Sequence, residues 1–366
     1  MPLIETRTAR KQRIPAVEVL EPRARDSWTH TRNGDPRGYI DADKLKELWI
    51  HTGTACNLAC PFCLEGSHPG DGRIPGMKLS DVKPFIHEAL DMGVEQFSFT
   101  GGEPFVIRDF VNILDYASHH RPCFVLTNAT EPLPKRKHQV LPLLENPYPI
   151  HFRVSLDFPD RARHDKDRGD GSFHEALQGI RWLVDQGFKV SIARQTDPDE
   201  IPAEVEAEFR AIFREWNIAE DLAFTAFPDL GTPGSEDGSP EITETCMEKF
   251  PTKDSRGHFM CTYTRMLVKK GDQVRVYACT LVDDDPQYDL GGTLAESTYE
   301  RVMLRHHRCF SRYRFGASCP APGCLPQPVS WVLAACGAGT FLLGKRTRFA
   351  QTPFPGGEKS PPHRPR

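Results

Sequence analysis

Several features that mark common classes of protein are scarce or missing in this sequence of 366 residues. Lys and Arg number 46 against 50 Asp and Glu, so the net charge of -4 provides no overall basic surface for nucleic acid. The apolar run 329–344 contains three glycines and is shorter than the ~20 residues that a membrane-spanning helix needs. Residues 1–28 lack the apolar stretch of a secretory signal. We therefore expect a cytoplasmic protein with no membrane span and no nucleic-acid partner.

A disulfide framework is not expected either. Such frameworks are typical of short secreted chains with an even number of cysteines, whereas this chain has 11 cysteines. Hydrophobic residues make up 39% and charged residues 26%, which is typical of a folded protein with a core. The cysteines are therefore interpreted as serving metal or redox chemistry.

The hydrophobic pattern predicts six units in which a strand is followed by a helix or connecting segment. Strands are expected at 48–52, 96–100, 123–126, 150–156, 188–193 and 222–227, and helices at 79–92, 107–119, 133–144, 173–186 and 202–216. This alternation indicates an α/β fold with a parallel sheet. Six units suit either a doubly wound sheet or an incomplete barrel, and in both the chemistry lies at the C-terminal ends of the strands.

Composition divides the chain into five expected parts. They are a lead-in at 1–45, a core at 46–227, a linker rich in Gly, Pro, Ser and acidic residues at 228–245, a cysteine-rich module at 246–324 and a poorly ordered tail at 325–366.

Three cysteines follow the first expected strand with the spacing C-x-x-x-C-x-x-C: Cys56, Cys60 and Cys63. Thiolates select iron–sulfur clusters and zinc, and three of them on one short loop can converge on one metal centre. Three ligands would leave one iron of a cluster open to a further group. The alternative is a structural zinc loop with a distant fourth ligand such as His51 or His68.

A second motif, Thr-Gly-Gly-Glu-Pro at residues 100–104, ends the next strand. Parallel neighbours place this turn at the same end of the sheet as the three cysteines. Gly101 and Gly102 permit a close approach of the backbone to a ligand, and Glu103 adds a carboxylate. The alternative is a glycine turn with a solvated acid.

Together, CNLACPFC and TGGEP resemble the radical S-adenosylmethionine (radical SAM) superfamily over roughly residues 46–227. The resemblance implies a partial (β/α)6 TIM-like barrel. It also implies a [4Fe–4S] cluster on Cys56, Cys60 and Cys63, with S-adenosylmethionine on the fourth iron. The turn of Gly101, Gly102 and Glu103 would hold the methionyl end, and the aromatic Phe62 would lie near the adenine.

Three further contacts to the cofactor are implied. The segment Val-Ser-Leu-Asp ending the fourth strand resembles that of radical SAM enzymes which modify peptides and proteins, so Ser155 and Asp157 are candidates. Arg194, at the end of the fifth strand, could reach the same ligand. The alternative for each is a polar residue that satisfies a cap or a loop.

The region 261–324 resembles the auxiliary-cluster module, of SPASM or twitch type, found in radical SAM maturases. Four cysteines are the implied ligands of one second [4Fe–4S] cluster: Cys261, Cys279, Cys309 and Cys319. The chain lacks the C-x-x-C-x-x-x-x-x-C run of the full module, which favours one auxiliary cluster over two. Zinc or free thiols are the alternatives.

The resemblance implies reductive cleavage of S-adenosylmethionine to a 5′-deoxyadenosyl radical, which takes hydrogen from a peptide, protein or small-molecule substrate. An electron donor such as flavodoxin or ferredoxin is the implied partner. No further catalytic residue is predicted. The alternatives are a non-catalytic iron–sulfur or zinc-binding protein, or a cluster-binding subunit without turnover.

Overall fold

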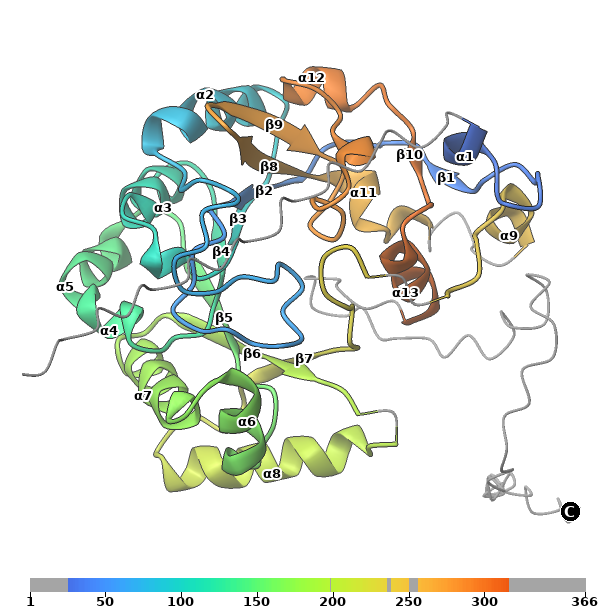
Figure 1. The fold of residues 1–366 in the computed structure, drawn as a ribbon. Helices are drawn as coiled ribbons and strands as arrows, with labels where there is room; N and C mark the ends of the chain where they lie inside the picture. The colour runs from blue at the N-terminus through green and yellow to red at the C-terminus, as the bar shows by residue number, and fades with distance from the viewer. Residues whose placement is uncertain (1–25, 198, 236–237, 250–255, 316–366) are drawn as a thin grey trace, which may run out of the picture.

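The computed structural model describes residues 26–315 except 198, 236–237 and 250–255 (Figure 1). Its central feature is a curved sheet of eight strands in the order β7-β6-β5-β4-β3-β2-β8-β9. Six strands, β2 to β7, run parallel: Glu47–His51, Gln96–Thr100, Cys123–Thr127, Ile150–Ser155, Lys189–Gln195 and Ala223–Phe227. All six strands predicted from the hydrophobic pattern are present, with ends shifted by at most two residues.

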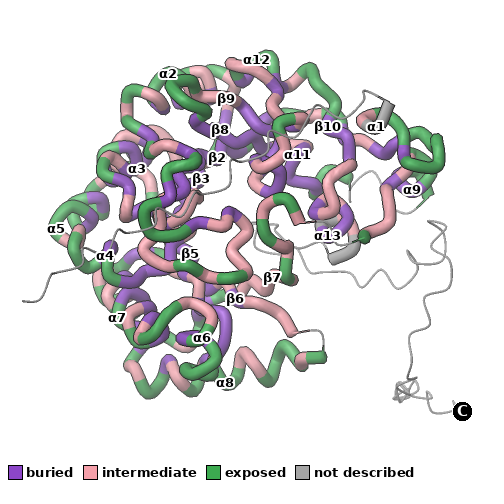
Figure 2. The backbone as a smooth tube through the Cα atoms, in the orientation of Figure 1, coloured by how far each residue is buried: buried purple, intermediate pink, exposed green. Residues whose placement is uncertain are grey.

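Helices cover the outer side of this sheet, as Figure 1 shows. The main ones are α2 (Leu79–Asp91), α3 (Phe110–Ser118), α7 (Ser172–Asp185) and α8 (Pro202–Glu215), each within three residues of its prediction. Their apolar faces pack on the strands, so the buried residues follow the sheet and the exposed ones lie on the outer helices (Figure 2).

Two predicted helices differ from the structure because of proline. The helix expected from residue 107 begins at Phe110, since Pro104–Val106 forms a 3-10 turn (η1) first. The helix expected at 133–144 is broken into α4 (Pro132–Lys135), α5 (Lys137–Val140) and a 3-10 turn, η2 (Leu141–Glu145). Pro134 and Pro142 interrupt a continuous helix because proline has no N–H to donate. A further helix, α6 (Arg161–Arg168), was not predicted.

The later part of the chain adds two strands to the same sheet. Strand β8 (Thr264–Lys270) pairs in parallel with β2, and β9 (Gln273–Tyr277) pairs with β8 as an antiparallel hairpin. The first six residues of β8 are buried. The cysteine-rich part therefore shares the sheet of the barrel.

Small elements beside this hairpin surround a second hydrophobic core. They are α1 (Asp26–Thr29), α9 (Glu244–Lys249), α11 (Met260–Tyr263), η3 (Pro286–Tyr288) and α13 (His307–Phe315), whereas Leu294 of α12 (Leu294–Ser297) packs in the first core. The two-residue strands β1 (Tyr39–Ile40) and β10 (Val302–Met303) pair with each other. The buried Arg37 donates to Glu241 at 2.7 Å, so the lead-in and the expected linker lie against each other.

Within the described ranges, no helix combines the length and the apolarity needed to cross a bilayer. The expected tail at 325–366 and Cys319 lie outside the described residues.

Candidate functional site

One large cavity opens at the C-terminal ends of the parallel strands. The three cysteines of the loop after β2 line it, together with Gly101 and Gly102 of the turn after β3. Four predicted cofactor contacts also line it, from three parts of the chain: Phe62, Ser155, Asp157 and Arg194. The topology therefore gathers most of the predicted site residues on one surface.

Hydrogen bonds hold the cysteine loop over this cavity. The backbone N–H of Leu58 donates to the Cys56 sulfur at 3.4 Å, and that of Cys63 donates to the Cys60 carbonyl at 3.1 Å. Asn57 links the loop to the segment after β4, because its amide oxygen accepts from Asn128 at 3.0 Å. The loop is thus supported by the neighbouring strand as well as by its own turns.

The thiols of this loop lie in a partly desolvated place. Burial is the main cause that raises the pKa of Cys56, to about 12, and it also raises the pKa of Cys60. A bound metal centre would have to supply the positive charge that makes such thiols ionise. Three thiols around an apolar cavity fit an iron–sulfur cluster by the chemistry of the donor set.

The two glycines of the turn are needed for backbone packing. A Cβ on Gly102 would lie 2.4 Å from the Ala55 carbonyl oxygen, and one on Gly101 would lie 2.6 Å from that of Gly53. Gly101 also has φ +146°, a conformation that favours glycine. The close approach that these glycines permit is therefore to the start of the cysteine loop, and it locks the two motifs together.

Glu103 is buried, with 1% of its surface exposed, and it does not line the cavity with its two glycine neighbours. Its carboxylate accepts from Thr127 Oγ1 at 2.9 Å, from the Asn128 N–H at 2.8 Å and from the Phe105 N–H at 3.1 Å. Burial is the main cause that raises the pKa of Glu103 to about 7. A carboxylate has about four acceptor positions, so one remains for a ligand.

Asp157 lines the cavity but already has a partner. Its carboxylate accepts two hydrogen bonds from Arg168, on the unpredicted helix α6. The Arg168 guanidinium also lies 5.5 Å from the centre of the Phe62 ring. Arg168 is a site residue that the sequence did not reveal, because only the fold brings its helix back over the cysteine loop.

Arg194 has unused donors at the cavity wall. Its side chain is fully buried, and Nη1 donates to Glu200 at 2.6 Å. Nε and Nη2 are buried and have no hydrogen-bond partner among the described residues. Two such N–H groups match the geometry of a carboxylate, which S-adenosylmethionine carries.

The second group of cysteines converges on a smaller cavity. Cys261, Cys279 and Cys309 line it together with apolar side chains. Burial is the main cause that raises the pKa of Cys309 to about 12. Met260 and Leu281 line both cavities, so the two share a wall. The fourth implied ligand, Cys319, is not among the described residues.

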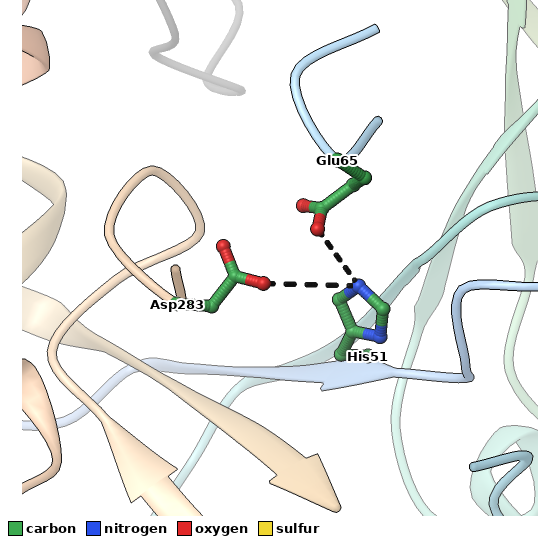
Figure 3. Close-up of side chains that lie close together, drawn as sticks. All are labelled: His51, Glu65 and Asp283. Atoms are coloured by element: carbon green, nitrogen blue, oxygen red, sulfur yellow. Dashed lines mark ion pairs between the residues drawn. The ribbon is translucent and has the colours of Figure 1, made fainter. Parts of the chain in front are cut away.

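A third polar group lies behind the cysteine loop, where His51, Glu65 and Asp283 meet (Figure 3). His51 Nε2 lies 3.1 Å from Glu65 Oε2 and 3.9 Å from Asp283 Oδ2. In the part of the chain that the structure describes, these are the only three such ligand atoms within 4.8 Å of one another.

This group is better suited to hydrogen bonding than to a cation. The Gly53 N–H donates to His51 Nδ1 at 3.3 Å, so a neutral ring carries its proton on Nε2. Burial lowers the pKa of His51, but Glu65 and Asp283 outweigh it and raise the pKa overall. With its proton on Nε2, the ring has no lone pair there for a metal. His51 therefore faces Glu65 and is not available as a zinc ligand for the cysteine loop.

Comparisons with known proteins agree with these motifs. The family model of the Radical SAM superfamily matches residues 50–212. Mycofactocin maturase MftC of Mycolicibacterium smegmatis is 34% identical over 142 residues, covering 38% of this chain and 35% of MftC. AdoMet-dependent heme synthase of Nitratidesulfovibrio vulgaris is 28% identical over 193 residues, covering 50% of this chain and 48% of that protein. The chain thus spans less than half the length of either relative.

A solved structure shows the same fold. The crystal structure of Streptococcus suis SuiB bound to precursor peptide SuiA aligns with a TM-score of 0.51 and 17% identity, covering 70% of this chain and 65% of SuiB. Together with the parallel sheet, this likeness confirms the α/β partial barrel that the motifs implied.

Proposed function

We propose that this chain is a radical SAM enzyme that acts on a peptide, because residues 50–212 match the family model of the Radical SAM superfamily. A [4Fe–4S] cluster on Cys56, Cys60 and Cys63, when bound with S-adenosylmethionine, supplies the electron that cleaves this cofactor and starts hydrogen abstraction from the substrate. The rest of the site binds and orients the reacting groups.

The observation that carries the proposal is that three thiols and a buried arginine with unused donors line the same cavity. The three thiols of the cysteine loop line it, and so does the buried Arg194, whose Nε and Nη2 have no hydrogen-bond partner among the described residues. A zinc site or an electron carrier has no use for such donors. A cofactor that carries both a carboxylate and a cluster-binding group uses both features.

Each residue then has a distinct task. Arg194 binds the carboxylate of S-adenosylmethionine, and the turn of Gly101 and Gly102, with Glu103 buried behind it, receives the methionyl end. The Gly101–Gly102 backbone sets the distance between this end and the cysteine loop. Phe62 and Ser155 line the cavity on the side left for the adenosyl group. Asp157 acts through Arg168, which it holds beside Phe62.

A second [4Fe–4S] cluster on Cys261, Cys279, Cys309 and Cys319 belongs to the same proposal. Three of these cysteines share one cavity, and Met260 and Leu281 separate it from the larger one. An apolar shell of this kind controls solvent access to a cluster and its potential.

The proposal also covers the substrate, the electron donor and the cellular location. A peptide substrate is favoured because SuiB binds a precursor peptide and MftC is a maturase; a small molecule is the alternative. The reaction needs a one-electron donor of the flavodoxin or ferredoxin class. An oxygen-sensitive cluster of this type suits the cytoplasm.

Iron counting with paired variants tests the assignment of the cysteines. After anaerobic reconstitution, we expect Cys60→Ala to lose about four irons per chain and Cys279→Ala to lose a different set of about four. Cys123→Ala is the matched control, since Cys123 is buried at the start of β4 and hydrogen-bonds to the Arg121 carbonyl. Equal iron in Cys60→Ala and wild type would contradict the assignment.

A further inference from the structure

Three leucines from three separate segments form one part of the apolar lining of the large cavity, called here the leucine wall. Leu64 follows the cysteine loop, Leu230 lies in the expected linker, and Leu281 follows Cys279. All three belong to the second hydrophobic core, with Trp49 and Phe124 of the sheet. None of the three leucines is among the residues assigned to S-adenosylmethionine, so this wall is available to a substrate.

A single side chain joins the backbones of these three segments. Arg308, on α13, is fully buried and donates to the carbonyl oxygens of the same three leucines. The distances are 3.3 Å from Nη2 to Leu64, 3.1 Å from Nε to Leu230 and 3.0 Å from Nη1 to Leu281. Nη2 also donates to the Gly231 carbonyl at 3.1 Å, and Nη1 to Asp284 at 3.3 Å.

Arg308 is bound mainly by backbone oxygens. A buried cation normally faces a close carboxylate, yet four of the five contacts of Arg308 are to backbone oxygens and only Asp284 brings charge. The planar guanidinium directs its donors at fixed angles, so it sets the relative positions of all three segments at once. The next residue, Cys309, is an implied ligand of the second cluster.

From this geometry we propose that Arg308 is a positioning residue that fixes the leucine wall of the substrate cavity between the two cluster sites. It touches neither cofactor nor substrate. The wall that it fixes is apolar, so the part of the substrate placed beside the cofactor is an apolar side chain. The role of the wall in substrate binding rests on the proposed function. That Arg308 holds the three segments in place can be tested without turnover.

Hydrogen exchange in the full chain without clusters is the first readout. Three amides report on the three segments, because each is itself hydrogen-bonded: Gly66 to the Cys63 carbonyl, Gly231 to the Asp229 carboxylate and Asp285 to the Val282 carbonyl. Arg308→Gln should raise exchange at all three amides together, by about tenfold or more. Arg308→Lys, with three donors in place of five, should give an intermediate effect and serves if the glutamine variant fails to fold.

Arg265→Gln is the matched control. Arg265 is also a buried arginine of this region and donates to the backbone carbonyls of Cys261, Thr264 and Ser297, none of which belongs to the wall. It should leave exchange at Gly66 and Gly231 unchanged. Equal effects of Arg265→Gln and Arg308→Gln on these two amides, or an effect of Arg308→Gln confined to α13, would overturn the proposal.

The second readout is the electron paramagnetic resonance spectrum of the reduced, reconstituted chain with S-adenosylmethionine. At equal iron content, Arg308→Gln should shift the g-values, since Leu64 directly follows the cluster ligand Cys63. Identical spectra would overturn the positioning role even if stability falls. Failure of wild type to cleave S-adenosylmethionine would count against the proposed function only, since the exchange result does not depend on it.

Discussion

At the scale of single residues, the site contains two kinds of buried polar group. Some have all their hydrogen-bond partners within the chain, and others have donors without a partner among the described residues. Glu103 has three hydrogen bonds from the chain and Asp157 is held by Arg168, whereas Arg194 keeps two N–H groups without partners. That the three cysteines and the two glycines of the turn lie at one cavity could be predicted from the sequence, because each motif directly follows one of two neighbouring parallel strands. Arg168 and Arg308 could not, since only the fold brings them to the cavity.

The raised pKa of Glu103 predicts a pH dependence of stability. Burial raises this pKa from an ordinary value of 4.5 to about 7. Between these values the folded chain holds a proton that the unfolded chain has lost, so the free energy of unfolding falls as pH rises from about 4.5 to 7. Glu103→Gln cannot titrate and should show a flatter curve. Denaturant unfolding of the metal-free chain at several pH values measures this, and parallel curves for both proteins would refute it.

The two unpartnered N–H groups of Arg194 predict that this side chain strengthens the binding of S-adenosylmethionine. Arg194→Gln removes the charge and both unpartnered N–H groups, and a hydrogen bond to a charged group contributes ~1.5–3 kcal/mol. We expect S-adenosylmethionine to bind at least tenfold more weakly in calorimetry. Arg163→Gln is the control, because Arg163 forms an exposed pair with Asp197. A change of less than twofold in Arg194→Gln would remove this residue from the site.

At the scale of elements, the strands follow the hydrophobic pattern closely and the helices follow it except near proline. Strand ends were predicted to within two residues because turn-forming residues such as Gly93, Gly101 and Gly187 lie beside the strands in the sequence. The pairing of β8 with β2 could not be predicted, since parallel pairing between segments more than 200 residues apart leaves no local pattern. The same holds for α6, whose eight residues carry little apolar periodicity.

The contact between the glycine turn and the cysteine loop predicts that Gly102 does not tolerate a larger side chain. Gly102→Ala places a Cβ 2.4 Å from the Ala55 carbonyl and 2.6 Å from that of Thr54, which are backbone atoms that cannot rotate away. Overpacking of this kind costs ~1–3 kcal/mol or more. We expect a lower melting temperature and less iron bound after reconstitution. Gly72→Ala should resemble wild type, because nothing lies within 4 Å of its Cβ; the reverse order of the two variants would contradict this account.

At the scale of the whole molecule, the barrel and the cysteine-rich part share one sheet and adjoining cores. Strand β8 covers the edge of β2 that the predicted core would leave open, with four residue pairs in register. The lead-in is joined to the expected linker by Arg37 and Glu241 and to the later chain by β1 and β10. The two cysteine groups are thus held in fixed relation by shared structure.

Because the sheet is shared, we expect that residues 1–245 do not fold when the later part of the chain is removed. A chain ended after residue 245 exposes Leu48 and Ile50 at an unpaired edge of β2. We expect it to aggregate or to unfold without a cooperative transition, while the full chain melts cooperatively in circular dichroism. A soluble truncated chain with a sharp melt would show that β8 is dispensable.

The central claim is that this chain cleaves S-adenosylmethionine at the cluster held by the loop after β2. The most direct measurement is 5′-deoxyadenosine formed by the anaerobically reconstituted, chemically reduced full chain, quantified by chromatography and compared with Cys56→Ala, Cys60→Ala and Cys63→Ala. The account predicts 5′-deoxyadenosine from the wild type and none above background from each variant. A wild-type chain that holds its iron but forms no 5′-deoxyadenosine would contradict it.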